Sequence, residues 1–419
     1  MATITPPTYR VRLVDPVIDT LFSQLPALMV IGPRATGKTR TSERRAATVV
    51  RLDRELEATA FEADPDAALG DTPEPALLDE WQMTPGVLGA VRRAVDASPH
   101  PGRFLLTGSV RAVSQNRVWP ATGRLVRLAM FPMSVREQIG RVSGPTFFDL
   151  LAEGGEPRMP NDPPDLPGYL DLALRSGFPE AALELDGEPR QAWLESYVDD
   201  LLTHDVEQLE DSATRRRDPG RLRRYLEAYA LSSAGVASHR AIYEAGGVSK
   251  ATASAYEDLL EGLLIAERVP AWASNRMKRL VRQPKRYLID PALIAAALRI
   301  DARSAMRDGN LLGRILDTFV AAQLRPELIA SATKPRLHHL RTAQGRQEVD
   351  LVAELAGGRL IGIEVKASAA PRRADARHLA WLRDEVGERF AAGVVLHTGP
   401  RAYRLDEGIV AAPIAALWS

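Results

Sequence analysis

The chain has 419 residues, of which 45% are hydrophobic and 26% charged, a balance typical of a folded, soluble protein with roughly two to four domains. Its formal net charge of zero excludes a uniformly basic nucleic-acid-binding coat, so any such surface must be local. The absence of cysteine excludes disulfide bonds and thiolate metal sites. No apolar run resembles a signal peptide or a membrane span, and we therefore expect a cytoplasmic protein.

Short apolar runs alternate with helix-like stretches over the first part of the chain. The runs have the length and composition of buried parallel strands and lie at 27–32, 48–53, 75–80, 103–109 and 124–130. This alternation predicts a doubly wound α/β domain, which we assign to residues 1–150.

Residues 32–39 read GPRATGKT and fit the phosphate-binding pattern GxxxxGK[ST], after one predicted strand and before a helix. In this pattern backbone N–H groups cradle phosphate oxygens, Lys38 reaches the β- and γ-phosphates, and the Thr39 hydroxyl ligates Mg²⁺. The alternative is a glycine-rich turn with no ligand. We expect ATP contacts from Gly32, Pro33, Arg34, Ala35, Thr36, Gly37, Lys38, Thr39 and Arg40.

An acidic pair ends the predicted strand at 75–80. Asp79 is placed to hold Mg²⁺ through water, and Glu80 to orient the attacking water as a catalytic base. A solvated strand end is the alternative, but strand, loop, lysine and acidic pair together favour ATP hydrolysis with Mg²⁺.

Two further polar positions are candidates for the same site. Thr107 or Ser109 ends the strand at 103–109, next to the expected place of Asp79, and is a candidate sensor of the γ-phosphate. Arg124 is a candidate to supply positive charge to the transition state, in its own subunit or in a neighbouring one. A plain structural role is the alternative for each of them.

The stretch from 151 to 214 is predicted to be a linker followed by a helical segment. Residues 153–168 are rich in proline, glycine and acidic residues, which indicates an exposed loop. From Tyr169 to about Leu209 the pattern is helical, and Trp193 and Tyr197 lie on one apolar stripe with Leu201 and Leu202.

Residues 215–300 are predicted to form a winged helix. Between Arg215 and Asp290 there are 15 Lys or Arg against 8 Asp or Glu. A helix, a Gly-Gly turn and a second helix follow one another, with Ser238 and Ser249 as N-caps, and two strands then flank a basic ribbon. This order favours DNA as a partner, with the ribbon along the phosphates. The expected contacts are Arg276, Lys278, Arg279, Arg282, Lys285 and Arg286.

A winged helix that only packs between domains is the alternative to DNA binding. Three acidic residues on its second helix, Glu257, Asp258 and Glu261, are unfavourable for contact with DNA.

Residues 301–419 alternate strands and helices again and carry a nuclease-like pattern. In IGIEVKA the side chains of Glu364 and Lys366 share one strand face, and Asp350 lies on the preceding strand. Two carboxylates and a lysine on one face of a hairpin can bind Mg²⁺ and activate water, with Asp317 as a further ligand. This is the D…(E)xK arrangement of restriction-endonuclease-like phosphodiesterases. Lysine is scarce, with six residues against 48 arginines, so each lysine marks a place for a compact ammonium.

The alternatives for this tail are an exposed Glu–Lys pair without chemistry, or a nuclease-like fold that binds without cleaving. The hairpin register decides whether Asp350 can join the site, because a shift of one residue turns a side chain to the other face. We predict a three-residue loop, 356–358, with glycine in the left-handed region, which sets Asp350 opposite Glu364.

In chain order these features resemble a bacterial and archaeal family of AAA-type ATP-binding proteins. Its members couple a P-loop domain to a winged helix and to a C-terminal restriction-endonuclease-like, PD-(D/E)xK domain of unknown function. The resemblance covers nearly the whole chain and implies no established reaction for the tail. The segments that carry it are GPRATGKT, LLDEWQMTP, FLLTGS, the GR before FPMSVREQ, RSGFPEA, KRYLIDPAL, EVDLV, IEVKAS and GVVLHTG.

The chain departs from the family pattern in two places. Asp317 stands where the family usually has glutamate, which shortens the reach of that ligand. His204-Asp205 stands where the family usually has Arg-Asp, which puts a nucleotide-sensing role of that arginine in doubt.

We therefore expect an Mg²⁺-dependent ATPase that acts on DNA, in which the nucleotide state controls the winged helix and the nuclease-like domain. The alternative is an ATP-gated switch whose tail binds nucleic acid or a partner without cutting. A small-molecule kinase would leave the basic middle and the tail unexplained. The sequence leaves the oligomeric state open, and an oligomer is compatible with it.

Overall fold

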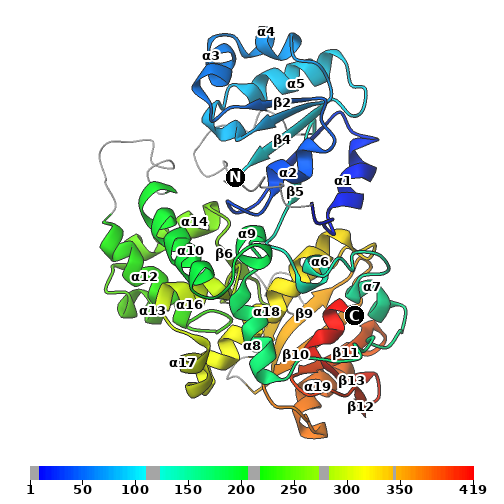
Figure 1. The fold of residues 1–419 in the computed structure, drawn as a ribbon. Coiled ribbons are helices and arrows are strands. Elements are labelled where there is room, and N and C mark those ends of the chain that lie inside the picture. The colour runs from blue at the N-terminus through cyan, green and yellow to red at the C-terminus, as the bar shows by residue number, and fades with distance from the viewer. Residues whose placement is uncertain (1–8, 110–122, 206–217, 273–282, 343–345) are drawn as a thin grey trace, which may run out of the picture.

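The computed structural model describes residues 9–109, 123–205, 218–272, 283–342 and 346–419. Figure 1 shows a parallel sheet with its helices at the top, a helical region at the lower left and a second sheet at the lower right. Among the described helices, none combines the length and apolar composition that crossing a bilayer requires.

The first sheet is parallel and has the order β2-β3-β4-β1-β5. Its strands confirm the five predicted runs: β1 (Ala27–Ile31), β2 (Thr48–Arg51), β3 (Ala76–Asp79), β4 (Phe104–Gly108) and β5 (Val126–Ala129). Its helices are α1 (Asp15–Phe22), α2 (Lys38–Glu43), α3 (Glu55–Ala63), α4 (Pro65–Gly70) and α5 (Val87–Ala97).

Both faces of this sheet are buried, as a parallel sheet requires. Met29 and Leu106 pack with Val91 of α5 on one face, whereas Val30 and Leu105 lie in a separate cluster with the α1 side chains on the other. The alternation along β1 and β4 therefore fixes the sheet between two helical layers.

The chain then leaves the sheet through short helices. α6 (Val135–Gln138) and α7 (Phe147–Ala152) precede a stretch without helix or strand, and this stretch covers most of the predicted linker. α8 (Leu166–Arg175), α9 (Pro179–Leu183), α10 (Gly187–Asp200) and the π-helical turn η2 (Leu201–Asp205) follow, which confirms the predicted helical segment.

The middle segment, residues 218–300, contains the predicted helix, tight turn, helix and pair of strands. Its elements are α12 (Pro219–Leu231), α13 (His239–Ala245), α14 (Lys250–Gly262), β6 (Ala266–Val269), β7 (Lys285–Leu288) and α16 (Ala292–Leu298). Ser238 and Ser249 cap α13 and α14 as predicted, and their hydroxyls accept from the backbone N–H groups of Ala241 and Thr252 at 3.0 and 3.1 Å. β6 and β7 are antiparallel.

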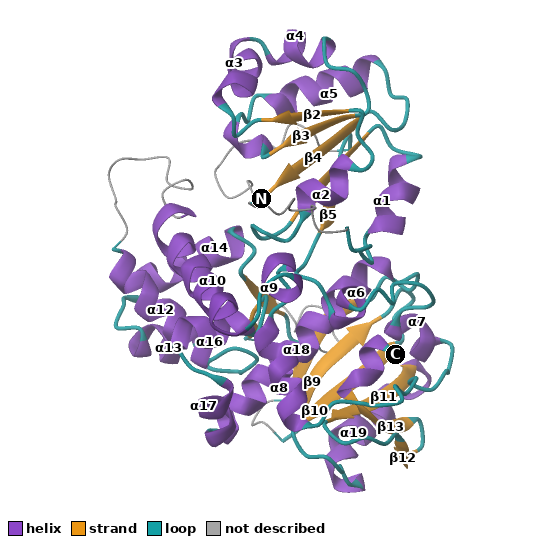
Figure 2. Ribbon diagram, in the orientation of Figure 1, coloured by secondary structure: helices purple, strands orange, loops and turns teal. Residues whose placement is uncertain are grey.

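The C-terminal segment forms a mixed sheet with the order β12-β13-β11-β10-β9-β8 (Figure 2). Its strands are β8 (Arg336–Arg341), β9 (Glu348–Glu354), β10 (Leu360–Lys366), β11 (Phe390–His397), β12 (Tyr403–Asp406) and β13 (Ile409–Pro413). α17 (Ala302–Arg307) and the long α18 (Gly309–Ala330) precede the sheet, α19 (Arg377–Val386) lies between β10 and β11, and the 3₁₀ turn η6 (Ile414–Trp418) follows β13.

The helices α18 and α19 cover opposite faces of this sheet. Ile361 and Ile363 of β10 pack in the cluster that holds Leu316 of α18, whereas Leu360 packs in the cluster that holds Leu379 of α19. The α18 cluster continues without a break through α14 to α7, so the segments predicted at 151–214, 215–300 and 301–419 share apolar packing.

Candidate functional site

The phosphate-binding loop lies at the carboxyl end of β1 and leads into α2. Gly37 has a φ of 89°, a conformation that glycine adopts readily, and the Cβ of any other residue at Gly32 would lie 2.2 Å from the Met130 carbonyl oxygen. The Lys38 ammonium donates to the Pro33 carbonyl at 2.8 Å. Burial lowers the pKa of Lys38 to about 8, although Glu80 and Asp79 act in the opposite direction.

Asp79 ends β3 beside the loop and is held by two hydroxyl groups. Thr39 Oγ1 lies 2.9 and 3.1 Å from the two carboxylate oxygens of Asp79, and Thr107 at the end of β4 donates to the same carboxylate. The hydroxyl of Thr39 beside a carboxylate is the donor set that Mg²⁺ prefers in phosphate sites, so these residues fit the ion. Bound there with ATP, Mg²⁺ would neutralise charge on the phosphates.

Glu80 follows Asp79 and has a φ of 53°, which is uncommon for a residue with a side chain. Its carboxylate accepts from Ser109 Oγ at 3.2 Å and from Gln82 Nε2. The predicted catalytic base is therefore oriented by a hydroxyl and an amide. Gln82 was not predicted, although it belongs to the motif LLDEWQMTP.

Arg124 does not lie near these residues. The prediction that it supplies positive charge to the site of its own subunit is therefore wrong. It precedes β5, at the edge where the parallel strands begin, and its Nε donates to Asp96 at 2.7 Å. The loop and Asp79 lie at the edge where the strands end. A strand of five residues separates the two edges by about 15 Å.

Side chains from outside the first sheet hold the backbone of the loop. The buried Arg12 donates to the Thr36 carbonyl at 2.9 Å and to Glu137 at 3.0 Å. The Tyr197 hydroxyl of α10 donates to the Arg34 carbonyl at 3.3 Å. The sequence did not reveal these contacts, because each joins residues that are far apart in the chain.

Three of the quoted motifs meet near the buried Asp290, in KRYLIDPAL. Its carboxylate accepts from Ser176 Oγ at 2.9 Å and from the Gly177 N–H at 2.7 Å, both in RSGFPEA. The Gly177 carbonyl accepts in turn from the N–H of Met133, in FPMSVREQ, at 2.6 Å. These bonds join the exit of the first sheet, the helical segment and the middle segment.

The hairpin register in the C-terminal sheet confirms the prediction. Leu360 pairs with Glu354 and Ile363 with Leu351, and the same register sets Asp350 opposite Glu364. The Leu355 N–H donates to the Arg359 carbonyl at 2.9 Å across the loop, and both of its glycines have positive φ, 88° and 83°.

The acidic residues at this hairpin are paired with ammonium groups. Lys366 Nζ lies 3.0 Å from Glu364 Oε2, and Lys285 Nζ of β7 lies 3.0 Å from Asp350 Oδ1. Asp350 Oδ2 accepts from the Val365 N–H at 3.1 Å. Burial, followed by the charge of Asp350, raises the pKa values of Glu364 and Asp317 to about 8.

Mg²⁺ therefore does not fit the carboxylates of the tail in this conformation. The described residues contain no group of three His, Asp or Glu side chains placed to hold a metal ion, so Asp317, Asp350 and Glu364 do not form one. The prediction that these three residues ligate Mg²⁺ is therefore wrong for this conformation, because both oxygens of Asp350 are already engaged.

Two of the expected DNA contacts are buried, which corrects their assignment. Lys285 and Arg286 are only 2% and 5% exposed, and Arg286 forms an ion pair with Glu257. Glu257, one of the three acidic residues named as unfavourable for contact with DNA, is therefore itself buried on α14. The remaining contacts, Arg276, Lys278, Arg279 and Arg282, lie outside the described residues.

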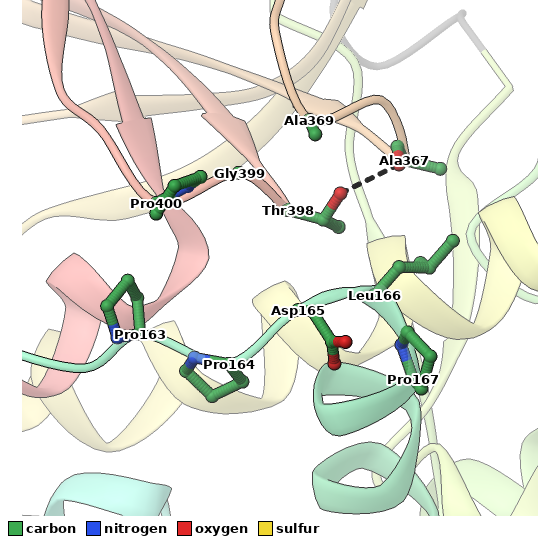
Figure 3. Close-up of a pocket in the computed structure, with 10 residues that line it drawn as sticks. All are labelled: Pro163, Pro164, Asp165, Leu166, Pro167, Ala367, Ala369, Thr398, Gly399 and Pro400. Carbon is green, nitrogen blue, oxygen red and sulfur yellow. Dashed lines mark hydrogen bonds between the residues drawn. The ribbon is translucent and has the colours of Figure 1, made fainter.

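A pocket of about 470 Å³ is lined by residues 163–167 and by residues that follow β10 and β11 (Figure 3). Its polar groups are engaged locally: Thr398 Oγ1 donates to the Ala367 carbonyl at 2.8 Å, and Asp165 accepts from the Gly168 N–H at 3.0 Å. The other walls are mostly proline and alanine, and we assign the pocket no chemistry.

Comparison with known families gives three matches along the chain. Residues 24–139 match the family described as AAA domain, residues 167–304 match a domain of unknown function, DUF8612, and residues 312–417 match another, DUF4143. The AAA match makes the first region an ATP-binding domain of an AAA-type ATPase.

Two mycobacterial proteins resemble nearly the whole chain. They are the uncharacterized protein Rv2008c of Mycobacterium tuberculosis and the uncharacterized protein Mb2031c of Mycobacterium bovis. Each is 30% identical over 395 residues, which cover 93% of this chain and 80% of the relative. The chain belongs to their family. The common ancestry extends beyond the AAA domain to the segments that contact its loop.

Proposed function

We propose that this protein is an Mg²⁺-dependent ATPase that acts as a switch, in which the nucleotide state sets the arrangement of the middle and C-terminal segments. The observation that carries the proposal is the contact of the phosphate-binding loop with distant elements. Arg12 holds the Thr36 carbonyl and Tyr197 holds the Arg34 carbonyl, so a loop that closes on phosphate pulls on both.

The residues around the loop have distinct parts in the proposed hydrolysis. Lys38 neutralises the β- and γ-phosphates, which requires its ammonium to leave the Pro33 carbonyl. Thr39 and Asp79 would hold Mg²⁺, which supplies charge neutralisation. Glu80, oriented by Ser109 and Gln82, accepts hydrogen bonds and can position and polarise the attacking water.

The route from the loop to the tail runs through buried polar contacts. Tyr197 belongs to α10, and the helical segment is joined to the middle segment at Asp290. A second connection joins α6 to α18, where Arg136 Nη1 lies 2.8 Å from Glu327 Oε1. Such buried pairs tolerate few intermediate geometries, which suits a switch with two arrangements.

As the partner of this switch we propose nucleic acid, bound through the winged helix. The support is the charge of the segment between β6 and β7, with Arg276, Lys278, Arg279 and Arg282. We favour binding without cleavage, since the oxygens of Asp350 are engaged by Lys285 and the Val365 N–H.

Steady-state ATP turnover in the presence of Mg²⁺ tests the ATPase part of the proposal. Lys38→Ala should abolish ATP binding or turnover, and Glu80→Gln should retain binding but lose turnover by about 10²-fold or more. Lys250→Ala, which removes an exposed lysine from α14, is the matched control and should turn over ATP like the unaltered chain. Unchanged turnover in both site variants would remove the ATPase assignment.

A further inference from the structure

A groove of about 600 Å³ lies among the helices α8, α10, α16 and α17 (Figure 1). α16 packs against both α8 and α10, and the start of α17 completes the lining. The volume is typical of ligand sites. The phosphate-binding loop is not part of this groove, although Tyr197, which contacts the loop, lies further along α10.

The part of the lining that α16 provides is small and apolar. Ala292, Ala295 and Ala296 lie three and four residues apart, so their methyl groups share one face of the helix. Leu174 of α8 and Ile300 also line the groove, and both are only partly buried. Methyl groups leave room for the stem of a long side chain, and covering this apolar surface would stabilise a complex.

Carboxylates dominate the charged groups of the groove. Four carboxylates and two guanidinium groups line it, those of Asp171, Glu188, Glu195 and Asp301 and those of Arg175 and Arg190. Arg190 is already engaged, because it donates to the Ala181 carbonyl at 2.7 Å and to Asp186 at 2.8 Å. Within the described ranges, none of the four carboxylates forms an ion pair, so their charge is not balanced inside the chain.

The contacts that these groups do make are with neutral donors. Glu195 accepts from the Gln191 amide at 2.9 Å, and Asp301 accepts from the Ser304 N–H at 2.8 Å. Asp171 and Glu188 are exposed, and neither they nor Arg175 hydrogen-bond to another residue in the described part of the chain. The groove therefore offers free acceptors on both α8 and α10, and one free donor.

We propose that this groove docks a basic segment of a partner protein. Lysine and arginine fit both parts of the lining, because their stems are apolar and their ends are charged. The stems lie on the alanines of α16, and the charged ends meet the carboxylates of α8 and α10. Arg175 donates to a backbone carbonyl of the bound segment. Four carboxylates disfavour an acidic segment or a nucleic acid here, because like charges repel. The proposal does not depend on ATP hydrolysis.

Selection from a displayed library of random peptides on the full chain tests this proposal. The retained peptides should be rich in lysine and arginine, and the variant Asp171→Asn/Glu188→Gln should not retain them. Both of these side chains are exposed, so the variant should fold like the unaltered chain. Glu55→Gln/Glu62→Gln is the matched control, because it removes the same charge from exposed positions of α3 and should retain the peptides.

Fluorescence anisotropy of a retained peptide gives the size of the effect. Asp171→Asn/Glu188→Gln should weaken its binding by about 5- to 30-fold, as expected for the loss of two ion pairs at a surface. Ala295→Leu fills the groove without changing its charge and should also weaken binding. Circular dichroism establishes that each variant is folded.

Three results would overturn the proposal. The first is a selection that enriches no basic peptide. The second is a peptide that binds a folded groove variant as tightly as it binds the unaltered chain. The third is self-association of the chain that Asp171→Asn/Glu188→Gln abolishes, because the groove would then belong to an interface between two copies.

Discussion

The ion pair between Arg136 of α6 and Glu327 of α18 joins the exit of the AAA domain to the tail, and its loss should be costly. Both residues are buried, at 7% and 1% exposure. Glu327 Oε1 lies 2.8 Å from Arg136 Nη1, and Glu327 Oε2 accepts from the Phe147 N–H at 2.7 Å. Arg136→Met would remove the only positive charge that these contacts give to Glu327.

The size of the effect follows from what the variant leaves behind. Breaking a buried ion pair by removing one partner costs about 3–5 kcal/mol, because the other charge stays buried. The guanidinium also donates to three backbone carbonyls, those of Arg141, Ser143 and Pro145, at 2.7–3.1 Å. A further change of Glu327 to Gln removes the charge and keeps an acceptor for Phe147. Arg136→Met/Glu327→Gln should therefore recover about 1–2 kcal/mol.

Amide exchange is the suitable assay, since a chain with several domains does not unfold in one step. The Phe147 N–H, and the Val135 N–H bonded to Gln323 Oε1 at 2.7 Å, report the opening of this interface directly. Their opening free energies should fall by about 3–5 kcal/mol in Arg136→Met. A loss below about 1 kcal/mol, or a double variant no more stable than the single one, would refute the reasoning.

Two further predictions concern His339 of β8 and the basic segment between β6 and β7. Burial, with the charge of Lys285 as the next cause, lowers the pKa of His339 to about 4, so the unfolded chain binds a proton below pH 6.5 that the folded chain does not. The free energy of opening around His339 should thus fall as the pH drops from 6.5 towards 4, by about 2 kcal/mol at pH 5 from this group, and amide exchange in His339→Gln should lack that part. DNA binding should weaken steeply with salt, and the Arg279→Ala/Arg282→Ala variant should flatten the salt dependence; a chain that binds no DNA at low salt would favour a protein partner for the winged helix.

Local patterns were sufficient to predict the elements whose geometry depends on neighbouring residues. The loop at 32–39 needs only a strand before it and glycines within it, and the hairpin register needs only the period of two and a Gly-Gly turn. The predicted place of Arg124 beside the loop was wrong, and strand geometry itself explains why. A residue that precedes a parallel strand lies at the opposite edge from residues that follow one.

Long-range contacts were not predictable in the same way. Lys285 was expected on a basic surface because its neighbours in sequence are basic, but it pairs with Asp350 from another segment. Tyr197 was recognised as part of an apolar stripe, yet its hydroxyl reaches the loop. In both cases the partner is chosen by tertiary packing, which a single sequence does not reveal.

The packing of Trp418 bears on how this protein can be dissected experimentally. Its ring lies 6.1 Å from that of Tyr169 and 6.0 Å from that of Phe319, and the Tyr169 hydroxyl accepts from the Ala415 N–H at 3.0 Å. A fragment cut near residue 300 would leave Tyr169 and its neighbours as a bare apolar surface prone to aggregation. Recombinant fragments that contain the tail should therefore start before α6, which also keeps Arg136 with Glu327, rather than at the boundary between the two domains of unknown function.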